Sequence, residues 1–476
     1  MSGIVSPNAD LTYNDVFLIP QYADLESRYD VDLRSVDGTT TLPVAVSNMT
    51  SVAGRRMAET VARRGGITVI PQDIPPEVLK SLIHSIKQAH TVFDTPITLS
   101  PNDLVTEALS LINKRAHGAI IVTSDGKPVG IFTENDAISV DKFSPLKSVM
   151  SPTVFVLPDS MTAEGMYRAL TEQHLSVAPV VDKAGYLVGI MTTKGAIRSG
   201  IYPPNVDKNN RLKVAVAIGI NGNVAEKVKV ALNCLADVLV VDTAHGHQKK
   251  MIDAIKAARK AGPKATIVAG NVVTKEATAD LIAAGADIVK VGVGPGAMCT
   301  TRVMTGVGRP QFSAVLECSA EARKHGKYVW ADGGIRYPRD IALAIAAGAS
   351  SVMFASWFAG TYESAGDLQK DSNGNLYKES FGMASRRAVM NRTKNELLFE
   401  RAKKEMFEEG ISSSKFIINP AAPSVEDIID DIAAGLRSAC SYTGAHNLQQ
   451  FYEKAKIGIQ TQSGYDEGKP VAENWK

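Results

Sequence analysis

The sequence contains 476 residues, of which 45% are apolar, 21% charged and 6% aromatic, and its formal net charge is +2. This length exceeds what one ordinary hydrophobic core supports, so two or more domains are expected. The small net charge argues against a general nucleic-acid binder, and no apolar run reaches the ~18 residues that a membrane span needs.

The cysteines and the N-terminus indicate the compartment. Four cysteines are widely scattered and include no Cys-x-x-Cys pair, so they predict neither a zinc site nor a disulfide framework. The N-terminus lacks a secretory signal pattern. We therefore expect a cytoplasmic protein with no membrane partner and no nucleic-acid partner.

In chain order, short apolar runs recur from residue 42 onward, and most are followed by an alanine-rich amphipathic stretch. Runs of this length alternating with helical patterns predict a parallel sheet, and eight such units predict an α/β fold, a (β/α)8 TIM barrel. A doubly wound open sheet is the alternative. The runs are 42–49, 66–70, 214–218, 238–241, 266–269, 288–291, 328–331 and 351–355.

Polar residues follow most of these runs. The C-terminal ends of the strands carry the working face of a barrel, so we expect these polar residues to meet at one end of it. They include Ser47, Gln72, Asp242, Thr243, Asn271, Asp332 and Ser356.

The long gap between the second and third runs contains an internal repeat. Segments 118–133 and 177–192 match at an offset of 59, and each follows an extended lead and a helix-like stretch. The two copies resemble a tandem CBS (Bateman) module inserted into the barrel. An insertion that only packs subunits together is the alternative. The expected domains are the first part of the barrel (1–91), the CBS pair (92–202, as about 92–146 and 147–202) and the second part of the barrel (203–476).

The CBS resemblance implies a site for regulatory purine nucleotides such as ATP or GTP. Thr133 and Asp136 match its ribose-phosphate signature in the first copy. The second copy keeps Thr192 but has Gly195 where the acid would stand, which favours one nucleotide site over two equal ones.

The run 288–291 leads into a Gly-Pro-Gly turn and then into Cys299, Thr300 and Thr301. Glycines let such a loop bend tightly and approach a ligand or an ion, and a cysteine held on it is a candidate nucleophile. A small buried thiol after a turn is the alternative. The Gly-x-Gly-x-Gly spacing also suggests a dinucleotide-binding loop, but no helix is expected to open directly after it.

Four segments resemble the IMP dehydrogenase/GMP reductase family, and the likeness covers nearly the whole chain. They are 294–302, 331–336, 382–385 and 435–444. In both reactions of this family a cysteine adds to C2 of the purine while hydride moves to or from a nicotinamide. By resemblance, Cys299 is that nucleophile.

The resemblance also implies ligand-binding positions. The carbonyls of Gly294, Gly296 and Cys299 match a potassium site, and a glycine-rich turn without acidic side chains suits a monovalent cation. Substrate-binding positions are Ser47, Met49, Asp332, Gly334, Ser356, Gly382 and Met383. Cofactor-binding positions are Asp242, Thr243, Asn271 and Gly292.

Two features limit how far the residue roles of the family apply to this chain. Ala297 and Ser380 replace the serine and tyrosine that dehydrogenases commonly use for phosphate, and Ala355 replaces a glycine, so the phosphate contacts are expected to be distributed differently. For Asp242, capping the next helix is an alternative role.

A second long insertion, about 361–420, forms the expected flap. Dehydrogenases of this family activate water with an Arg-Tyr pair on the flap, but the matching positions 395–397 read Asn-Glu-Leu. Thr301 and Glu409 match the pair that GMP reductases use to protonate the leaving amine. The resemblance therefore favours GMP reductase chemistry, in which GMP and NADPH give IMP and ammonia.

Two alternatives remain open at this stage. One is an IMP dehydrogenase that uses another base, such as Arg392 or Arg401, and the other is a nucleotide sensor with an inactive barrel. Cys299, Thr301 and Asp332 argue against the second. The family also implies a homotetramer that can pair into an octamer, and the polar tail 461–476 is expected to be poorly ordered unless a partner holds it.

Overall fold

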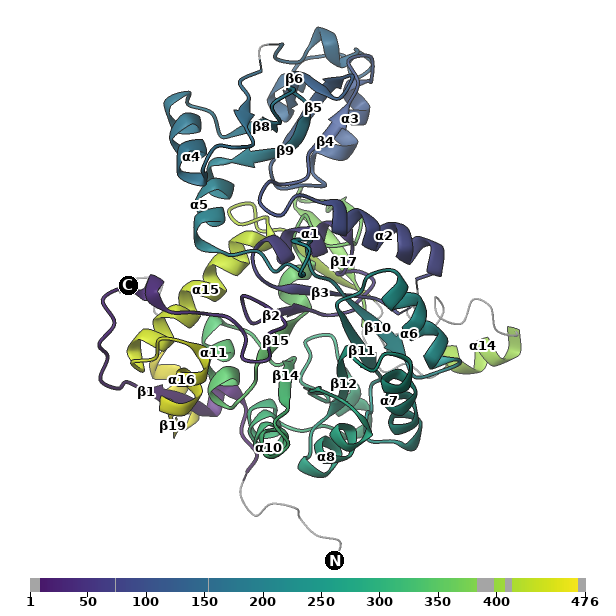
Figure 1. The fold of residues 1–476 in the computed structure, drawn as a ribbon, viewed down its shortest axis with the longest axis vertical. Coiled ribbons are helices and arrows are strands. Elements are labelled where there is room, and N and C mark those ends of the chain that lie inside the picture. The colour runs from purple at the N-terminus through teal and green to yellow at the C-terminus, as the bar shows by residue number, and fades with distance from the viewer. Residues whose placement is uncertain (1–8, 73, 153, 383–397, 407–412, 470–476) are drawn as a thin grey trace, which may run out of the picture.

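The computed structural model describes residues 9–72, 74–152, 154–382, 398–406 and 413–469. Its centre is a closed barrel of eight parallel strands in the order β10-β11-β12-β13-β14-β15-β2-β3 (Figure 1). The strands are β2 (Val44–Val46), β3 (Ile67–Ile70), β10 (Ala215–Gly219), β11 (Val238–Asp242), β12 (Thr266–Val272), β13 (Ile288–Val291), β14 (Tyr328–Asp332) and β15 (Ser351–Phe354). The predicted TIM barrel is confirmed, and the open sheet is excluded.

Helices alternate with these strands and cover the outside of the barrel. They are α1 (Arg55–Arg63), α2 (Pro76–Gln88), α6 (Val224–Asn233), α7 (Lys249–Ala261), α8 (Lys275–Ala284), α10 (Gln311–Lys324), α11 (Pro338–Ala346) and α15 (Val425–Tyr442). Helix α15 starts with a capping box at Ser424, and Glu426 and Asp427 in its first turn suit the helix dipole.

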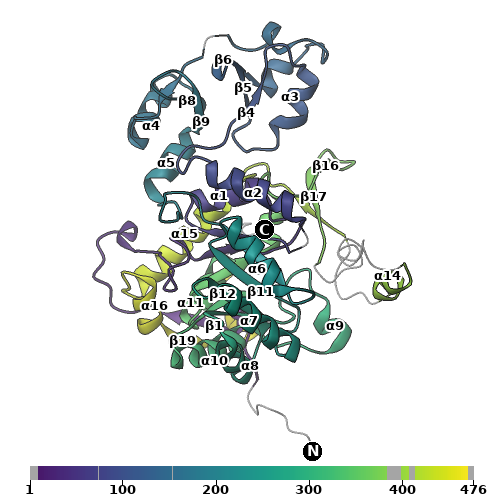
Figure 2. The same ribbon diagram turned by 45° about the vertical axis from the view of Figure 1, so that its right-hand side comes forward.

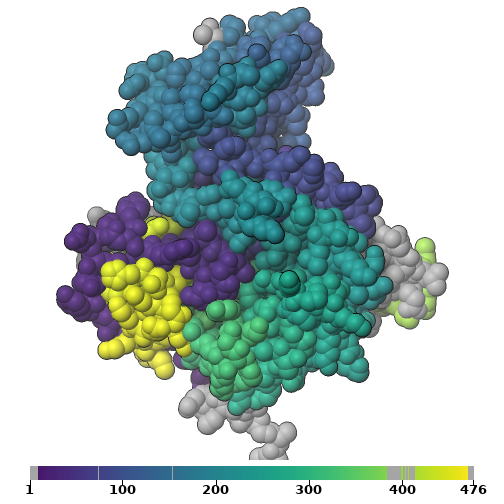
Figure 3. All heavy atoms as spheres, in the orientation of Figure 1, coloured from purple at the N-terminus to yellow at the C-terminus, as the bar shows by residue number. Residues whose placement is uncertain are grey.

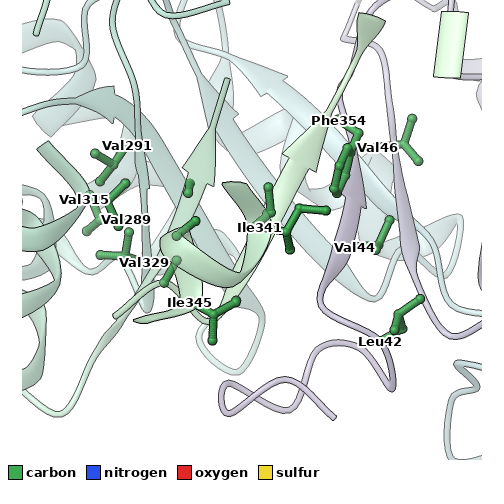
Figure 4. Packing of buried hydrophobic residues seen from close by; sticks show 14 of the residues in the cluster. Leu42, Val44, Val46, Val289, Val291, Val315, Val329, Ile341, Ile345 and Phe354 are labelled. Atoms are coloured by element: carbon green, nitrogen blue, oxygen red, sulfur yellow. The ribbon is translucent and has the colours of Figure 1, made fainter. Parts of the chain in front are cut away.

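Alternate residues of each strand face two separate cores. Val44 and Val46 belong to the larger core between the strands and the helices, where Ile341 and Ile345 of α11 also pack (Figure 4). Ala45, between the two valines, belongs to the small core inside the barrel. Fully burying a Val or Ile side chain contributes about 1.5–3 kcal/mol, so these two layers fix the register of the strands.

The insertion between α2 and β10 forms a lobe that sits on the barrel (Figure 3). It contains two three-stranded sheets of the same topology, with one parallel and one antiparallel pair in each. The first unit comprises β4 (Ile97–Leu99), α3 (Val105–Ile112), β5 (Ala119–Ser124) and β6 (Lys127–Thr133). The second comprises β7 (Leu157–Pro158), α4 (Ala163–Glu172), β8 (Val177–Val181), β9 (Leu187–Thr192) and α5 (Thr193–Ile201). Short 3-10 helices follow β6 at Glu134–Ala137 and Leu146–Ser148.

The first and last described segments of the chain pack beside the barrel. Strand β1 (Val16–Ile19) pairs antiparallel with β19 (Lys456–Ile459), and 3-10 helices span Tyr13–Asp15 and Arg28–Asp30. Helix α16 (Leu448–Lys454) precedes β19. The expectation that the tail is poorly ordered without a partner is wrong for its first part, because α17 (Gln462–Glu467) forms there with Thr461 as its N-cap.

The flap segment begins after α12 (Ser356–Ala359) with a three-stranded antiparallel sheet. Its strands are β16 (Leu368–Lys370), β17 (Leu376–Ser380) and β18 (Ser414–Ile417). Helix α14 (Leu398–Glu405) lies on the same side of the barrel as the short helix α9 (Thr301–Thr305) (Figure 2). Within the described ranges, every helix is too short or too polar to span a lipid bilayer.

Candidate active site

A cavity of about 710 Å³ opens at the C-terminal ends of the barrel strands. Its walls come from the strand ends and the loops that follow them, which is where TIM barrels carry their active sites. It brings together twelve of the predicted site residues: Ser47, Met49, Asn271, Gly292, Gly294, Gly296, Cys299, Thr301, Asp332, Gly334, Ser356 and Gly382.

The cysteine loop presents its thiol to this cavity. Cys299 is exposed, and its Sγ donates a hydrogen bond to Thr301 Oγ1 at 3.2 Å. The backbone N–H of Cys299 donates to the carbonyl of Gly296 at 3.0 Å, which closes the turn. The alternative of a buried thiol is therefore excluded, and an accessible nucleophile stands next to a hydroxyl.

The structure corrects one expectation about this loop. A short helix, α9, does open at Thr301, with Thr300 between it and the cysteine as the N-cap. It spans only 5 residues, so its pattern is too short to be recognised as periodic in the sequence. Its side chains are not buried, and α9 therefore lies on the surface at the rim of the cavity.

Gly292 is required where β13 ends. Its φ of +149° is disfavoured for other residues, and a Cβ there would lie 2.0 Å from the carbonyl oxygen of Asp332. The glycine therefore lets the end of β13 approach the end of β14. This close approach sets the loop of Cys299 beside the carboxylate of Asp332.

The carboxylate of Asp332 on β14 is held by one donor from β13 and one from β12. Its Oδ2 accepts from Lys290 Nζ at 2.8 Å and from Asn271 Nδ2 at 2.9 Å. Asn271 Nδ2 also donates to the carbonyl of Gly292 at 2.7 Å. A carboxylate fixed in this way has one oxygen left to accept hydrogen bonds from a ligand.

Asp242 and Thr243 lie behind the cavity wall and do not line it. Asp242 Oδ1 accepts from Lys290 Nζ at 2.8 Å, and its Oδ2 accepts from Asn48 Nδ2 at 3.0 Å. Thr243 exchanges backbone hydrogen bonds with Gly270 and Asn271. The alternative role for Asp242 as a helix cap is excluded, because the N-cap of α7 is Gln248.

Sequence reasoning missed Lys290, which is only 3% exposed. Burial lowers the pKa of its ammonium group, but the charges of Asp242 and Asp332 outweigh burial and raise the pKa above its ordinary value. A lysine inside the apolar run 288–291 was the signal that could have revealed it, since buried charges are paired.

Two further cavity residues, Tyr13 and Gln311, had no sequence signal. Both are almost fully buried, and the Tyr13 hydroxyl and Gln311 Oε1 have no hydrogen-bond partner among the described residues. Burial, followed by the charge of Asp340, raises the pKa of Tyr13. Gln311 Nε2 donates to the carbonyls of Val291 and Asp332 and so ties β13 to β14.

The remaining predicted residues fall elsewhere. Glu409, Met383 and Arg392 lie outside the described residues, and Arg401 lies on α14. Thr133, Asp136 and Thr192 lie in the insertion, away from the cavity. Asp136 accepts from the backbone and the hydroxyl of Thr133 at 2.7 and 2.9 Å, and Thr192 caps α5.

Comparison with known proteins gives three kinds of likeness. A family model described as the IMP dehydrogenase / GMP reductase domain matches residues 10–471. A GMP reductase of Mycobacterium tuberculosis is 52% identical over 470 residues, which cover 98% of each chain. An inosine-5'-monophosphate dehydrogenase of Staphylococcus aureus is 39% identical over 473 residues, which cover 97% of this chain and 95% of that protein.

A solved structure resembles nearly the whole chain. It is a GMP reductase of Trypanosoma brucei in complex with guanosine 5'-monophosphate, with a TM-score of 0.70 and 30% sequence identity. The match covers 98% of this chain and 99% of that one.

Proposed function

The chain belongs to the IMP dehydrogenase/GMP reductase family, and we propose that within this family it is a GMP reductase. The reaction converts GMP and NADPH to IMP, ammonia and NADP. The observation that carries this choice is the 52% identity to a GMP reductase over 98% of both chains, against 39% to a dehydrogenase. The missing Arg-Tyr pair in the flap supports the same choice.

The substrate fits the cavity by its polar groups. Asp332 accepts hydrogen bonds from the ribose diol, because its carboxylate is already oriented by Lys290 and Asn271. Gly334 and Ser356 bind the phosphate, while Ser47 and Met49 line the neighbouring wall. The backbone amides of Gly382 and Met383 recognise the edge of the purine.

The chemistry begins at Cys299. Its thiolate adds to C2 of GMP and forms a carbon–sulfur bond, while Thr301 and Glu409 direct a proton to the amine at C2. The carbon–nitrogen bond then breaks, and ammonia leaves a covalent Cys299–purine intermediate. When C2 receives hydride, the carbon–sulfur bond breaks, which releases IMP and returns the thiolate to Cys299.

NADPH, when bound, supplies that hydride. Four residues form the nicotinamide side of the site. Asn271 and Gly292 line the cavity, whereas Asp242 and Thr243 do not. Asn271 Oδ1 is buried and has no hydrogen-bond partner among the described residues, so it fits a ligand that brings a donor, as a carboxamide does.

A potassium ion fits the cysteine loop. Gly294, Gly296 and Cys299 offer neutral carbonyl oxygens from one turn, and each carbonyl has two lone pairs, so the bond from Cys299 N–H leaves Gly296 able to bind a cation. Such an ion would hold the loop, and with it the thiol, in shape. Potassium dependence of turnover tests this assignment.

The insertion regulates the barrel as a CBS module that binds purine nucleotides such as ATP or GTP. Thr133 and Asp136 form its ribose-phosphate site, and Thr192 belongs to the second copy. Like the family, the protein assembles as a homotetramer that can pair into an octamer. Nucleotide binding at the insertion shifts this packing.

The alternative function is that of an IMP dehydrogenase, which oxidises IMP with NAD and water. One observation favours it, namely the likeness to bacterial dehydrogenases over 97% of the chain. It would need a water-activating base in the flap, for which the sequence offers Arg392 or Arg401.

A stoichiometry measurement tests the reductase function. Purified protein given GMP and NADPH should release one ammonia for each NADPH consumed, with IMP as the only purine product. NADPH loss without ammonia would contradict the proposal, because hydride would then be transferred elsewhere.

A further inference from the structure

One ammonium group joins Asp332, which lines the cavity, to Asp242, which does not. Lys290 Nζ lies 2.8 Å from Asp332 Oδ2 and 2.8 Å from Asp242 Oδ1. The side chain of Lys290 is 3% exposed and does not line the cavity, so it cannot touch a bound ligand there. Its bonding capacity is directed at the two carboxylates.

The other bonds to these carboxylates fix their direction. Asn271 donates to the same oxygen of Asp332 that Lys290 binds, and Asn48 donates to the second oxygen of Asp242. The five side chains come from β11, β12, β13 and β14 and from the loop after β2. They form one hydrogen-bonded network across the open end of the barrel.

We propose that Lys290 is a positioning residue that couples the substrate half of the site to the cofactor half by holding Asp332 and Asp242 together. This inference rests on the proposed function, in which Asp332 binds the ribose of GMP and Asp242 supports the nicotinamide side. Without the ammonium group, the two carboxylates repel each other, and both turn away from their working orientation. Loss of Lys290 therefore weakens GMP and NADPH together.

The chain offers a matched control at the opposite end of the barrel. Lys87 on α2 is also 3% exposed in its side chain, and its Nζ lies 3.2 Å from Asp207 and 2.7 Å from Asp237. It is a buried lysine between two carboxylates that has no contact with the cavity. Removal of Lys87 therefore imposes a similar structural cost without disturbing the site.

The test compares Lys290→Met, Lys290→Arg and Lys87→Met in steady-state kinetics, together with GMP affinity by calorimetry and melting temperature. Lys290→Met should raise KM for GMP and KM for NADPH by about tenfold or more each, as loss of a charged hydrogen bond implies. Lys290→Arg keeps the charge but is bulkier, so it should raise both KM values less than Lys290→Met does. Lys87→Met should lower the melting temperature and leave both KM values unchanged.

A suppressor variant separates coupling from a general loss of structure. Adding Asp242→Asn to Lys290→Met removes one of the two repelling charges. The KM for GMP should therefore return towards the wild-type value, although Asp242 does not line the cavity. The inference would be overturned if the double variant had a KM for GMP as high as Lys290→Met alone, or higher. It would also be overturned if Lys87→Met raised the two KM values as much as Lys290→Met does. If wild-type protein does not consume GMP and NADPH, the proposed function fails, and GMP affinity across the same variants still decides the role of Lys290.

Discussion

At the residue scale, the proposed reaction depends on a thiol on the loop after β13 and on a hydroxyl 3.2 Å away from it. The exposed Cys299 faces the same cavity as Asp332, and Gly292 allows the ends of β13 and β14 to approach each other. In the proposed mechanism this sulfur forms the covalent intermediate, so every turnover requires it.

Replacement of the nucleophile should separate binding from chemistry. Cys299→Ala should reduce turnover by about a thousandfold or more, while the affinity for GMP measured by calorimetry stays within about threefold of wild type. Cys234→Ala, at the C-terminal end of α6, serves as the control and should keep full activity. Substantial turnover in Cys299→Ala would rule out the covalent step.

The proton donor is expected to act after GMP has bound. Glu409→Gln should slow ammonia release by about a hundredfold or more and leave GMP affinity nearly unchanged, as expected for loss of a general acid. Rapid-quench measurement of ammonia per turnover provides the readout. A large loss of affinity with unchanged turnover would assign Glu409 to binding instead.

The sequence predicted some residues of the candidate site but not others. Asp332, Asn271 and Ser356 could be predicted because polar residues after apolar runs gather at one end of a barrel. Gln311 could not, since the strands that it joins meet only in the folded chain. The apolar run around Lys290 signals a buried charge, but it does not identify the two carboxylates that pair with it.

At the scale of elements, two ion-pair clusters attach the insertion to the barrel. Arg115, which follows α3, pairs with the fully buried Glu59 of α1 and with Asp94, and Arg63 of α1 also pairs with Asp94 at 2.7 Å. On the other side, Arg198 of α5 pairs with Asp427 and Asp430 of α15 at 2.6 and 2.7 Å. Partners so distant in sequence leave no local signal, so the repeat predicted the insertion but not its attachment.

The first cluster should make the joint sensitive to acid. Burial raises the pKa of Asp94, but the charges of Arg115 and Arg63 outweigh burial and lower the pKa to about 2. Because the pKa of Asp94 is lowered on folding, its ionised carboxylate stabilises the folded state at any pH above the ordinary carboxyl pKa of 3.8. This stabilisation is lost as the pH falls from 3.8 towards 2. Asp94→Asn should therefore lose about 2 kcal/mol at neutral pH, from about 1.4 kcal/mol for each pKa unit.

Denaturant unfolding at pH 6, 4 and 3 checks this prediction. The difference between wild type and Asp94→Asn should shrink at the lowest pH, because the Asp94 carboxylate of the unfolded wild-type chain then binds a proton while that of the folded chain is still ionised. A constant difference across the three pH values would show that the ionised form of Asp94 does not stabilise the joint.

At the scale of the whole molecule, a TIM barrel carries an accessory lobe on one side and a flap beside the cavity. The count of apolar runs predicted the barrel, because each strand is buried on both faces and reads as an apolar run. The five-residue helix α9 and the tail helix α17 were not predicted, since both are too short to give a periodic pattern.

The lobe should respond to nucleotides independently of the cavity. Asp136→Ala should weaken ATP or GTP binding by about tenfold, as loss of hydrogen bonds to a ribose implies, and leave KM for GMP in the absence of effector unchanged. Calorimetry with each nucleotide and sedimentation of the assembly provide the readouts. Unchanged nucleotide affinity would remove Asp136 from the site.

The most direct measurement compares the fate of the covalent intermediate in the two directions. Protein given IMP and NAD should form at most one NADH per subunit and no free XMP, because the flap lacks the Arg-Tyr pair that activates water. The same preparation given GMP and NADPH should turn over continuously and release ammonia. Steady formation of XMP, with no consumption of GMP and NADPH, would contradict the assignment as a GMP reductase.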